Sequence, residues 1–333
     1  MRHLLPLHYI DTVARSGSIR RAASKLAITS TALNRRILAM EEELGVPIFE
    51  RLPRGVRLST AGELLIQHIR SQMADMERVK SQIADLSGAR RGHVSIVCGQ
   101  ALLPHFISKQ IALYRKEHPA VTFSVKVCDR KAAIEQLTSF DADLSVVFEP
   151  FRTAEFQPLS RVEQSLKAIM SASHPLAAKE KLGWSDLLST KVVLPTASNG
   201  MRYILDDAML RKGDELEKVI ESDNFDFIRN YLIHEHCVSF QLPIGLKDDG
   251  LEDDGTYHSG SETIEGIADG IEIVSRSIDE RAVPGGNLYV AQLKGRVLPV
   301  AAALFANAVV KALELRYAIP VEDAQDFKTG TAT

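Results

Sequence analysis

A group of hydrogen-bonding and cationic side chains stands near the N-terminus of this 333-residue chain. It occupies two short stretches, and its members are Thr29, Ser30, Thr31, Asn34, Arg35 and Arg36 in the first and Arg51, Arg54 and Arg57 in the second. Hydroxyl, amide and guanidinium groups bind the edges of bases and the phosphates of nucleic acids. These residues therefore predict recognition of double-stranded DNA, and we expect all nine to contact it.

A helix is expected to present the first group. Apolar residues recur at helical spacing on one stripe, formed by Leu33, Ile37, Met40 and Leu44. Thr29 or Ser30 is placed to cap the start of this helix, and Gly45 and Pro47 end it. Ser18 is placed to cap a shorter helix just before it. The pattern is typical of a helix-turn-helix whose second helix enters the major groove.

A hairpin is expected to present the arginines of the second group. The segments IFER and VRLS flank a turn at Leu52–Gly55, which predicts two short strands. Residues 1–58 hold ten Lys and Arg against five Asp and Glu, a charge of +5, while the whole chain carries −3. A basic module joined to a body of charge −8 favours binding of a polyanion by the module alone.

The same stretch resembles the winged helix-turn-helix of LysR-type transcriptional regulators. The segments EEELGVPIFER, RGVRLSTAG, AASKL and ALNRRI carry the resemblance, which is sharp over about the first ninety residues. Members of that family usually have Ser-Gln-Pro-Ala where this chain has residues 29–32, and Ser where it has Asn34. The resemblance implies a ligand-responsive transcriptional regulator, and these departures imply a base preference of its own.

Residues 59–89 are expected to form one long helix. Ser59 or Thr60 is placed to cap it, with Glu63 completing a capping box. Heptad spacing predicts a seam for pairing two chains, formed by Leu65, Ile69, Met76, Val79, Ile83 and Leu86 with Gln72 as a polar interruption. The alternative is a helix that packs on its own domain. The family resemblance favours dimerisation through this helix and a homodimer or homotetramer.

An α/β body follows, over residues 90–320. Segments 93–98, 103–118, 121–128, 130–140 and 143–148 alternate strand, helix, strand, helix and strand, which indicates a doubly wound parallel sheet. A second alternation follows. The resemblance implies a periplasmic-binding-protein-like effector domain, with subdomain I at about 93–163 and 275–318 and subdomain II at about 164–274. The chain is expected to cross between them near 161–166 and 273–277, and 321–333 to be a disordered tail.

A small-molecule effector, with a carboxylate as one candidate, is expected between the subdomains. Ligands in open α/β sheets bind beyond the carboxyl ends of strands, where helix N-termini favour anions. The residues that this rule selects are Gly99, Gln100, Ala101, Phe148, Thr196, Ser198, Asn199 and Gln241. No cofactor and no metal are predicted.

Some features indicate other sites only weakly. Cys98 and Cys128 end two strands of one predicted sheet, so a thiol-based redox-sensing regulator is the alternative within the same fold. His234 and His236 lack a third ligand, and the acidic insertion 247–260 lacks the spacing of a calcium loop.

Other classes of protein lack their signatures in this chain. No GxSxG, Walker, GxGxxG or HExxH motif is found, so we do not expect an enzyme. A solute-binding protein of the transport type would need a secretion signal and would not use a winged helix. No signal peptide and no stretch of membrane-spanning length are found, which predicts a cytoplasmic protein with reduced thiols and no membrane partner.

Overall fold

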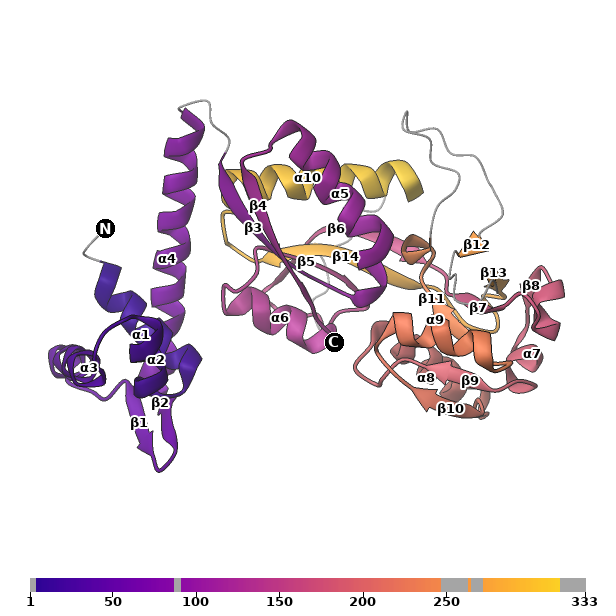
Figure 1. The fold of residues 1–333 in the computed structure, drawn as a ribbon, viewed down its shortest axis with the longest axis horizontal. Coiled ribbons are helices and arrows are strands. Elements are labelled where there is room, and N and C mark those ends of the chain that lie inside the picture. Colours follow the sequence, from indigo (N-terminus) through magenta and orange to yellow (C-terminus); the bar gives the residue numbers. More distant parts are fainter. Residues whose placement is uncertain (1–3, 87–90, 247–262, 265–271, 318–333) are drawn as a thin grey trace, which may run out of the picture. The chain divides into compact units, whose positions relative to one another are not determined.

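The computed structural model describes residues 4–86, 91–246, 263–264 and 272–317. The chain divides into two compact units, residues 1–88 and residues 89–333 (Figure 1). The acidic insertion and the tail expected at 321–333 lie outside the described residues. Each unit is described by itself below.

Three helices open the first unit: α1 (Leu5–Ser16), α2 (Ile19–Lys25) and α3 (Ser30–Leu44). Ser18 caps α2 by accepting from the Arg21 N–H, and Thr29 caps α3 by accepting from the Ala32 N–H. Gly45, at a φ of +71°, ends α3 in the left-handed conformation that suits glycine. Of the two caps predicted for α3, Thr29 is the one formed, and Ser30 is the first residue of the helix.

The hairpin consists of β1 (Phe49–Leu52) and β2 (Gly55–Leu58), paired antiparallel from Phe49 opposite Leu58 to Leu52 opposite Gly55. Its turn is docked on the α1–α2 connection, because the Val56 N–H donates to the Gly17 carbonyl at 3.0 Å. A Cβ on Gly55 would lie 2.3 Å from that same oxygen, so only glycine allows this approach. The β1–β2 hairpin is thus fixed to the helical core.

The long helix α4 (Thr60–Leu86) completes the first unit. Ser59 caps it by accepting from the Gly62 N–H at 3.0 Å, whereas Thr60 is already its first residue. The capping position is therefore Ser59 and not Thr60. Ile66 and Ile69 of α4 are buried in the core that α1, α2 and α3 form.

Two sheets organise the second unit. The first is ordered β4–β3–β5–β14–β6: β4 (Val121–Val127), β3 (Gly92–Cys98) and β5 (Leu144–Phe148) are parallel, and β14 (Gly286–Leu293) is antiparallel to both β5 and β6 (Phe156–Gln164). Two short turns, η2 (Gln100–Leu102) and η3 (Leu103–Ile107), lead into α5 (Ser108–Glu117). Helices α5 and α10 (Val300–Tyr317) cover one face, and α6 (Arg130–Thr138) covers the other. We call this body the first subdomain.

The second subdomain covers residues 165–285. Its larger sheet has the order β11–β7–β13–β12, formed by β11 (Ser239–Gln241), β7 (Lys167–Ser171), β13 (Ile273–Ile278) and β12 (Thr263–Ile264), with β8 (Lys181–Leu182) beside β13. A parallel pair, β9 (Val192–Leu194) with β10 (Lys218–Glu221), adjoins it. The remaining elements are η4 (Pro175–Ala178), α7 (Trp184–Leu188), α8 (Gly200–Lys212), α9 (Phe225–His234) and η5 (Pro243–Gly245).

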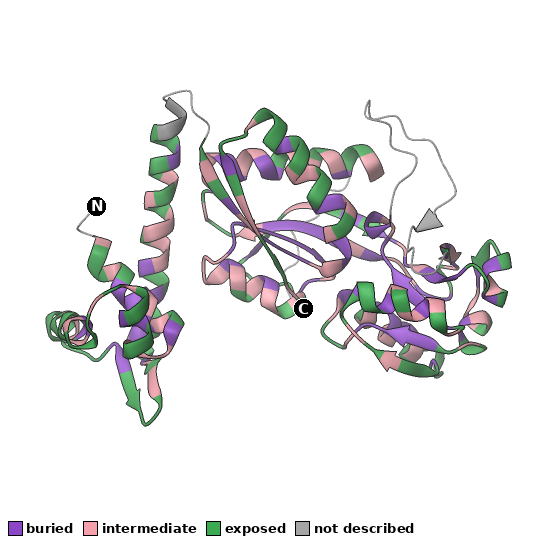
Figure 2. Ribbon diagram, in the orientation of Figure 1, coloured by how far each residue is buried: buried purple, intermediate pink, exposed green. Residues whose placement is uncertain are grey.

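One detail of the predicted fold is wrong. β13 pairs with β7 in the second subdomain, so the chain returns to the first subdomain between Ile278 and Gly286 and not near 273–277. The larger sheet of the second subdomain is antiparallel along β11, β7 and β13. The doubly wound architecture holds, and Figure 2 shows its central strands buried beneath exposed helix faces.

Candidate nucleic-acid interface and ligand cleft

One face of α3 is exposed and the opposite face is buried. Leu33 and Ile37 are fully buried in the core of the first unit. Thr31 and Arg35 are exposed on the other side, and Ser30 is exposed at the first position of the helix. Leu44, which the spacing places on the buried stripe, is 47% exposed, because it lies at the end of α3 beyond the core. A polar face on a rigidly packed helix is the arrangement that base reading requires.

Three of the predicted contact residues are held by neighbours within the unit. Nη2 of Arg51 donates to Oδ1 of Asn34 at 2.8 Å, which joins the hairpin to α3. The guanidinium carbon of Arg36 lies 5.0 Å from the ring centre of Tyr9 on α1. Arg36 is thus directed toward α1, while Arg35 stands on the exposed face.

The hairpin arginines differ in their surroundings. Arg54 lies in the exposed turn, and no ion pair is found for it among the described residues. Arg57 pairs across the strands with Glu50 at 2.7 Å. An exposed pair of this kind contributes little to stability and is screened by salt, so a phosphate could compete for Arg57.

The proposed pairing seam of α4 divides into two parts. Ile69 is fully buried in the core of its own unit, so its place in the predicted seam is wrong, because heptad spacing also arises where a helix packs on its own domain. Leu65 packs against the same core but is partly exposed, and its place in the seam stays a prediction. Val79 and Ile83 are 37% and 62% exposed, and Met76 is half-buried. The side chain of Leu86 lies outside the described residues.

A small cavity lies where the two subdomains meet. Five of the eight predicted effector residues line it, namely Gly99, Gln100, Ala101, Phe148 and Asn199. Its volume is about 30 Å³, enough for a single water, whereas ligand pockets measure roughly 300–1,000 Å³. The cavity as it stands is therefore too small for such a ligand.

Two glycines of the second subdomain allow the close approach of the subdomains here. A Cβ on Gly200 would lie 2.2 Å from the Phe148 carbonyl oxygen, and one on Gly245 would lie 2.3 Å from the Ala101 carbonyl oxygen. Contacts this short are excluded for any larger residue unless the backbone moves. The backbones of the two subdomains therefore meet directly at both positions.

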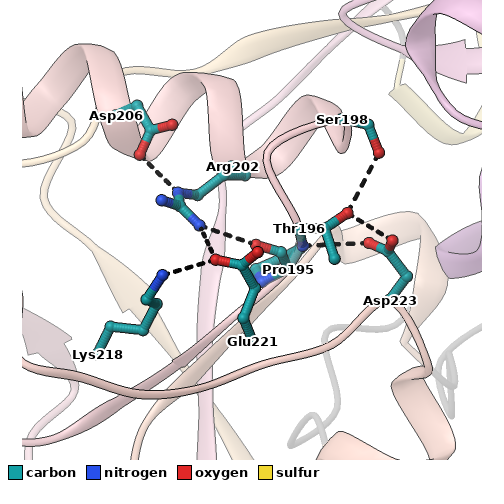
Figure 3. A network of polar contacts seen from close by, with 8 residues as sticks. All are labelled: Pro195, Thr196, Ser198, Arg202, Asp206, Lys218, Glu221 and Asp223. Carbon is teal, nitrogen blue, oxygen red and sulfur yellow. Dashed lines mark hydrogen bonds and ion pairs between the residues drawn. The ribbon is translucent and has the colours of Figure 1, made fainter.

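The three remaining predicted effector residues do not line the cavity. The Thr196 hydroxyl and N–H both donate to Asp223, at 2.5 and 3.2 Å, and the hydroxyl also lies 3.2 Å from Ser198 Oγ (Figure 3). Gln241 is buried and accepts from the Leu242 N–H, so Leu242 reaches the cavity in its place. Ser198 is itself exposed, and an effector contact by these three residues stays a prediction.

Arg202 holds the loop that carries Thr196 and Asn199. Its guanidinium donates to Asp206 at 2.6 Å, to Glu221 at 2.9 Å and to the Pro195 carbonyl at 3.2 Å (Figure 3). Hydrogen bonds from Lys218 and Arg202 lower the pKa of Glu221. Helix α8, strand β10 and the loop after β9 are thereby tied together on one side of the cleft.

Sequence reasoning missed Asp129 and Arg130, which both line the cavity. Asp129 caps α6 by accepting from the Lys131 and Ala132 N–H groups. The Arg130 guanidinium carbon lies 4.7 Å from the Phe151 ring centre and 4.0 Å from that of Tyr203 in the second subdomain. Its Nε donates to the Glu149 carbonyl. The Asp that directly follows the second predicted strand was the available signal, since α/β sites form where strands end.

The cysteines are neighbours, and burial disfavours the thiolate form of both. The Cys128 N–H donates to the Cys98 carbonyl at 3.0 Å, as expected for the ends of adjacent parallel strands. Burial raises the pKa of each thiol to about 12, with a further increase at Cys98 from Cys128 and at Cys128 from Asp129. The reactive thiolate is therefore scarce at neutral pH.

Two further searches covered the described residues only. They contain no group of three or more His, Cys, Asp or Glu side chains arranged to hold a metal ion. They also contain no helix long and apolar enough to cross a membrane.

Comparison with known proteins gives two family matches. The family described as "Bacterial regulatory helix-turn-helix protein, lysR family" matches residues 4–63, and "LysR substrate binding domain" matches residues 87–249. The activator CmpR of Synechocystis is 23% identical over 59% of this chain, and the aligned part spans 64% of CmpR, slightly under two thirds of its length. The RuBisCO operon transcriptional regulator of Allochromatium vinosum is 24% identical over 64% of this chain and 70% of its own.

Solved structures of similar fold cover nearly the whole chain. Full-length OxyR from Pseudomonas aeruginosa, in a variant form, aligns with a TM-score of 0.62 and 21% identity, over 92% of this chain and 97% of its own. Full-length CbnR in complex with its target DNA aligns with a TM-score of 0.59 and 15% identity, over 93% and 99%. At these identities the likeness establishes the fold alone.

Proposed function

Because this chain belongs to the LysR-type family of transcriptional regulators, we propose that it binds a specific DNA operator through α3 and the β1–β2 hairpin, under the control of a small molecule held between its two subdomains. The observation that carries the DNA-binding part is the exposed face of α3. Thr31 and Arg35 stand there, with Ser30 in the first turn, on a helix whose other face packs Leu33 and Ile37 into the core. Such a face can lie against base edges without losing any core contact.

The hairpin supplies the second, sequence-independent part of the interface. Arg54 projects from a turn that Gly17 and Gly55 fix to the helices. A cation held in this way contacts phosphates and sets the orientation of the reading helix. The excess positive charge of residues 1–58 adds the attraction to the DNA polyanion.

A two-fold dimer fits this module. Two copies would place their α3 helices in successive major grooves, about one helical turn apart, and would double the phosphate contacts. The exposed side chains of Val79 and Ile83 on α4 support pairing through the C-terminal half of that helix. A homotetramer made of two such pairs is part of the proposal, as is action in the cytoplasm, where the DNA lies.

The cleft supports control by an effector. Its cavity has room for one water, so an effector must bind a more open arrangement and thereby shift the equilibrium between the two. Asp129 and Asn199 already cap α6 and α8, and a carboxylate effector would find these helix N-termini occupied. Uncharged and cationic compounds therefore belong in any search beside carboxylates.

Selection of DNA from a random-sequence pool by the full-length protein tests the proposal. We expect enrichment of a partly palindromic site whose half-sites are spaced by about one helical turn. Recovery of unrelated sequences after several rounds would contradict specific binding. Thermal melting of the full-length protein with small molecules then tests the cleft, because a ligand of the folded state raises the melting temperature.

A further inference from the structure

The hydrogen bond between Arg51 and Asn34 fixes the orientation of one side chain on the reading face of α3. A guanidinium group only donates hydrogen bonds, so Asn34 must turn Oδ1 toward Arg51, 2.8 Å from Nη2. The Nδ2 amino group of Asn34, with its two hydrogens, then points away from Arg51. The amide of Asn34 can therefore offer a base only its Nδ2 donor.

The architecture of the hairpin explains why Arg51 reaches α3. Side chains alternate along a strand, so Arg51 lies on the same face of β1 as Phe49, which is buried in the core. Glu50 lies on the other face and pairs with Arg57. Among the described residues no carboxylate pairs with Arg51, and its positive charge remains beside Asn34.

The chemistry of this pair differs from that of a free asparagine. A free asparagine reads adenine with both ends of its amide, accepting from N6 and donating to N7. The Oδ1 of Asn34 accepts a hydrogen bond from the Arg51 cation. This bond weakens Oδ1 as an acceptor for a base and strengthens Nδ2 as a donor. The charge of Arg51 also disfavours the amino groups of adenine and cytosine. Guanine presents two acceptors, N7 and O6, in the major groove.

We infer that Asn34 and Arg51 form a donor-only unit that selects guanine at one position of each half-site. Asn34 contacts the base, and Arg51 is the residue that positions it. The inference rests on the proposed binding of DNA through α3 and adds to it the base that this position selects. It also assigns different roles to Arg51 and Arg54, because the place of Arg54 in the turn suits a phosphate contact.

The test uses the full-length protein and the operator selected by it, at physiological salt. Each guanine of a half-site is replaced in turn by 7-deazaguanine, which lacks the N7 acceptor. We expect one replacement to weaken binding by the unchanged protein about tenfold, as loss of a specific base contact does. Inosine at that position keeps N7 and O6 and serves as the matched DNA control, with binding expected to be unchanged.

Protein variants then assign the effect. In Asn34→Ser, Arg51→Ala and the double variant, we expect the sensitivity to 7-deazaguanine to disappear, with the double variant no weaker than the worse single one, because the two residues act as a unit. Arg54→Ala is the matched control: it should weaken binding to all sequences alike and keep the sensitivity. Circular dichroism melting checks that each variant folds.

A fourth variant is predicted to change which base is selected. Asn34→Asp keeps an acceptor for Arg51 but removes the Nδ2 donor, and a carboxylate accepts from cytosine N4. Selection with this variant should therefore replace guanine by cytosine at the same position and leave the other positions unchanged.

Two results would overturn the inference while the proposed function stands. One is an operator in which no guanine responds to 7-deazaguanine. The other is an Arg51→Ala variant that binds every sequence more weakly by the same factor and keeps the guanine preference. If the unchanged protein enriches no sequence at all, the proposed function itself fails, and this inference fails with it.

Discussion

At the scale of single residues, the partners of a side chain decide what it is free to do. Thr196 has the right type and position for an effector contact, yet Asp223 takes both its hydroxyl and its N–H. Arg36 stands one residue from Arg35 but packs over Tyr9. Asp223 lies 27 residues beyond Thr196 in the sequence. No local pattern in the sequence could have indicated this pairing.

His174 is a residue whose pKa differs between the folded and the unfolded chain. It is buried, its Nδ1 accepts from the Leu176 N–H at 3.1 Å, and its Nε2 lies 3.2 Å from Thr190 Oγ1. Burial, and then the neighbouring His236 ring, lower the pKa of His174 below its ordinary value near 6.5. The unfolded chain therefore takes up a proton at this position before the folded chain does.

Stability is accordingly expected to fall as the pH drops from 7 through 6.5 toward the lower pKa of the folded state, because the unfolded state then binds more protons. In His174→Asn the side chain can still accept from the Leu176 N–H but does not titrate. Urea unfolding of both proteins between pH 7 and 5.5 should show the smaller loss in the variant. Equal losses would contradict the role assigned to His174.

At the scale of elements, the sequence predicted what local signals encode. The caps Ser18 and Thr29 and the stop at Gly45 located α2 and α3, because each acts within one helical turn. The sheet that a strand joins, by contrast, is not set by local signals. The segment Ile273–Ile278 was expected to be a crossing, but it is a strand whose pairing with β7 depends on contacts about a hundred residues apart, so the second crossing was misplaced.

Helix α4 shows the same limit. Heptad spacing predicted one seam from Leu65 to Leu86, yet Leu65 and Ile69 pack on their own unit. The spacing describes a stripe and does not tell which partner covers each part of it. The candidate site shows the same limit. Five of the eight residues predicted from strand ends line the cavity, but Arg130, which also lines it, was not predicted.

The pairing surface is therefore expected to be the C-terminal half of α4. Ile83→Asp places a charge on a side chain that is 62% exposed in the single chain and that pairing would bury. Sedimentation of the full-length protein should show loss of one interface, with a tetramer reduced to a dimer or a dimer to a monomer.

Gln82→Asp is the matched control, because it adds the same charge at a neighbouring exposed position off the seam. It should leave the assembly intact. Identical sedimentation of the Ile83→Asp variant and the unchanged protein would move the interface elsewhere.

At the scale of the whole molecule, the account joins a DNA-reading module to a cleft that opens and closes. The side chain of Arg130 lies between the subdomains, because it belongs to the first and stacks on Tyr203 of the second. Stacking of this kind contributes roughly 0.5–2 kcal/mol per contact. Removal of the guanidinium should favour the open form.

In Arg130→Ala, amide hydrogen exchange over residues 196–203 should accelerate, and the free energy of unfolding should fall by about 1–2 kcal/mol. Lys131→Ala is the matched control, since Lys131 follows Arg130 on α6 and its side chain is 77% exposed. Unchanged exchange in the Arg130→Ala variant would mean that the cleft is held closed by the glycine contacts alone.

The central claim is that α3 reads a particular DNA sequence, and the ratio of specific to non-specific affinity tests it most directly. Fluorescence anisotropy with the selected operator and with a shuffled duplex, at physiological salt, gives this ratio for the full-length protein. We expect the operator to bind at least about a thousandfold more tightly. Arg35→Ala should cost about 1–3 kcal/mol on the operator and much less on the shuffled duplex. Equal affinity for the two duplexes would contradict the claim.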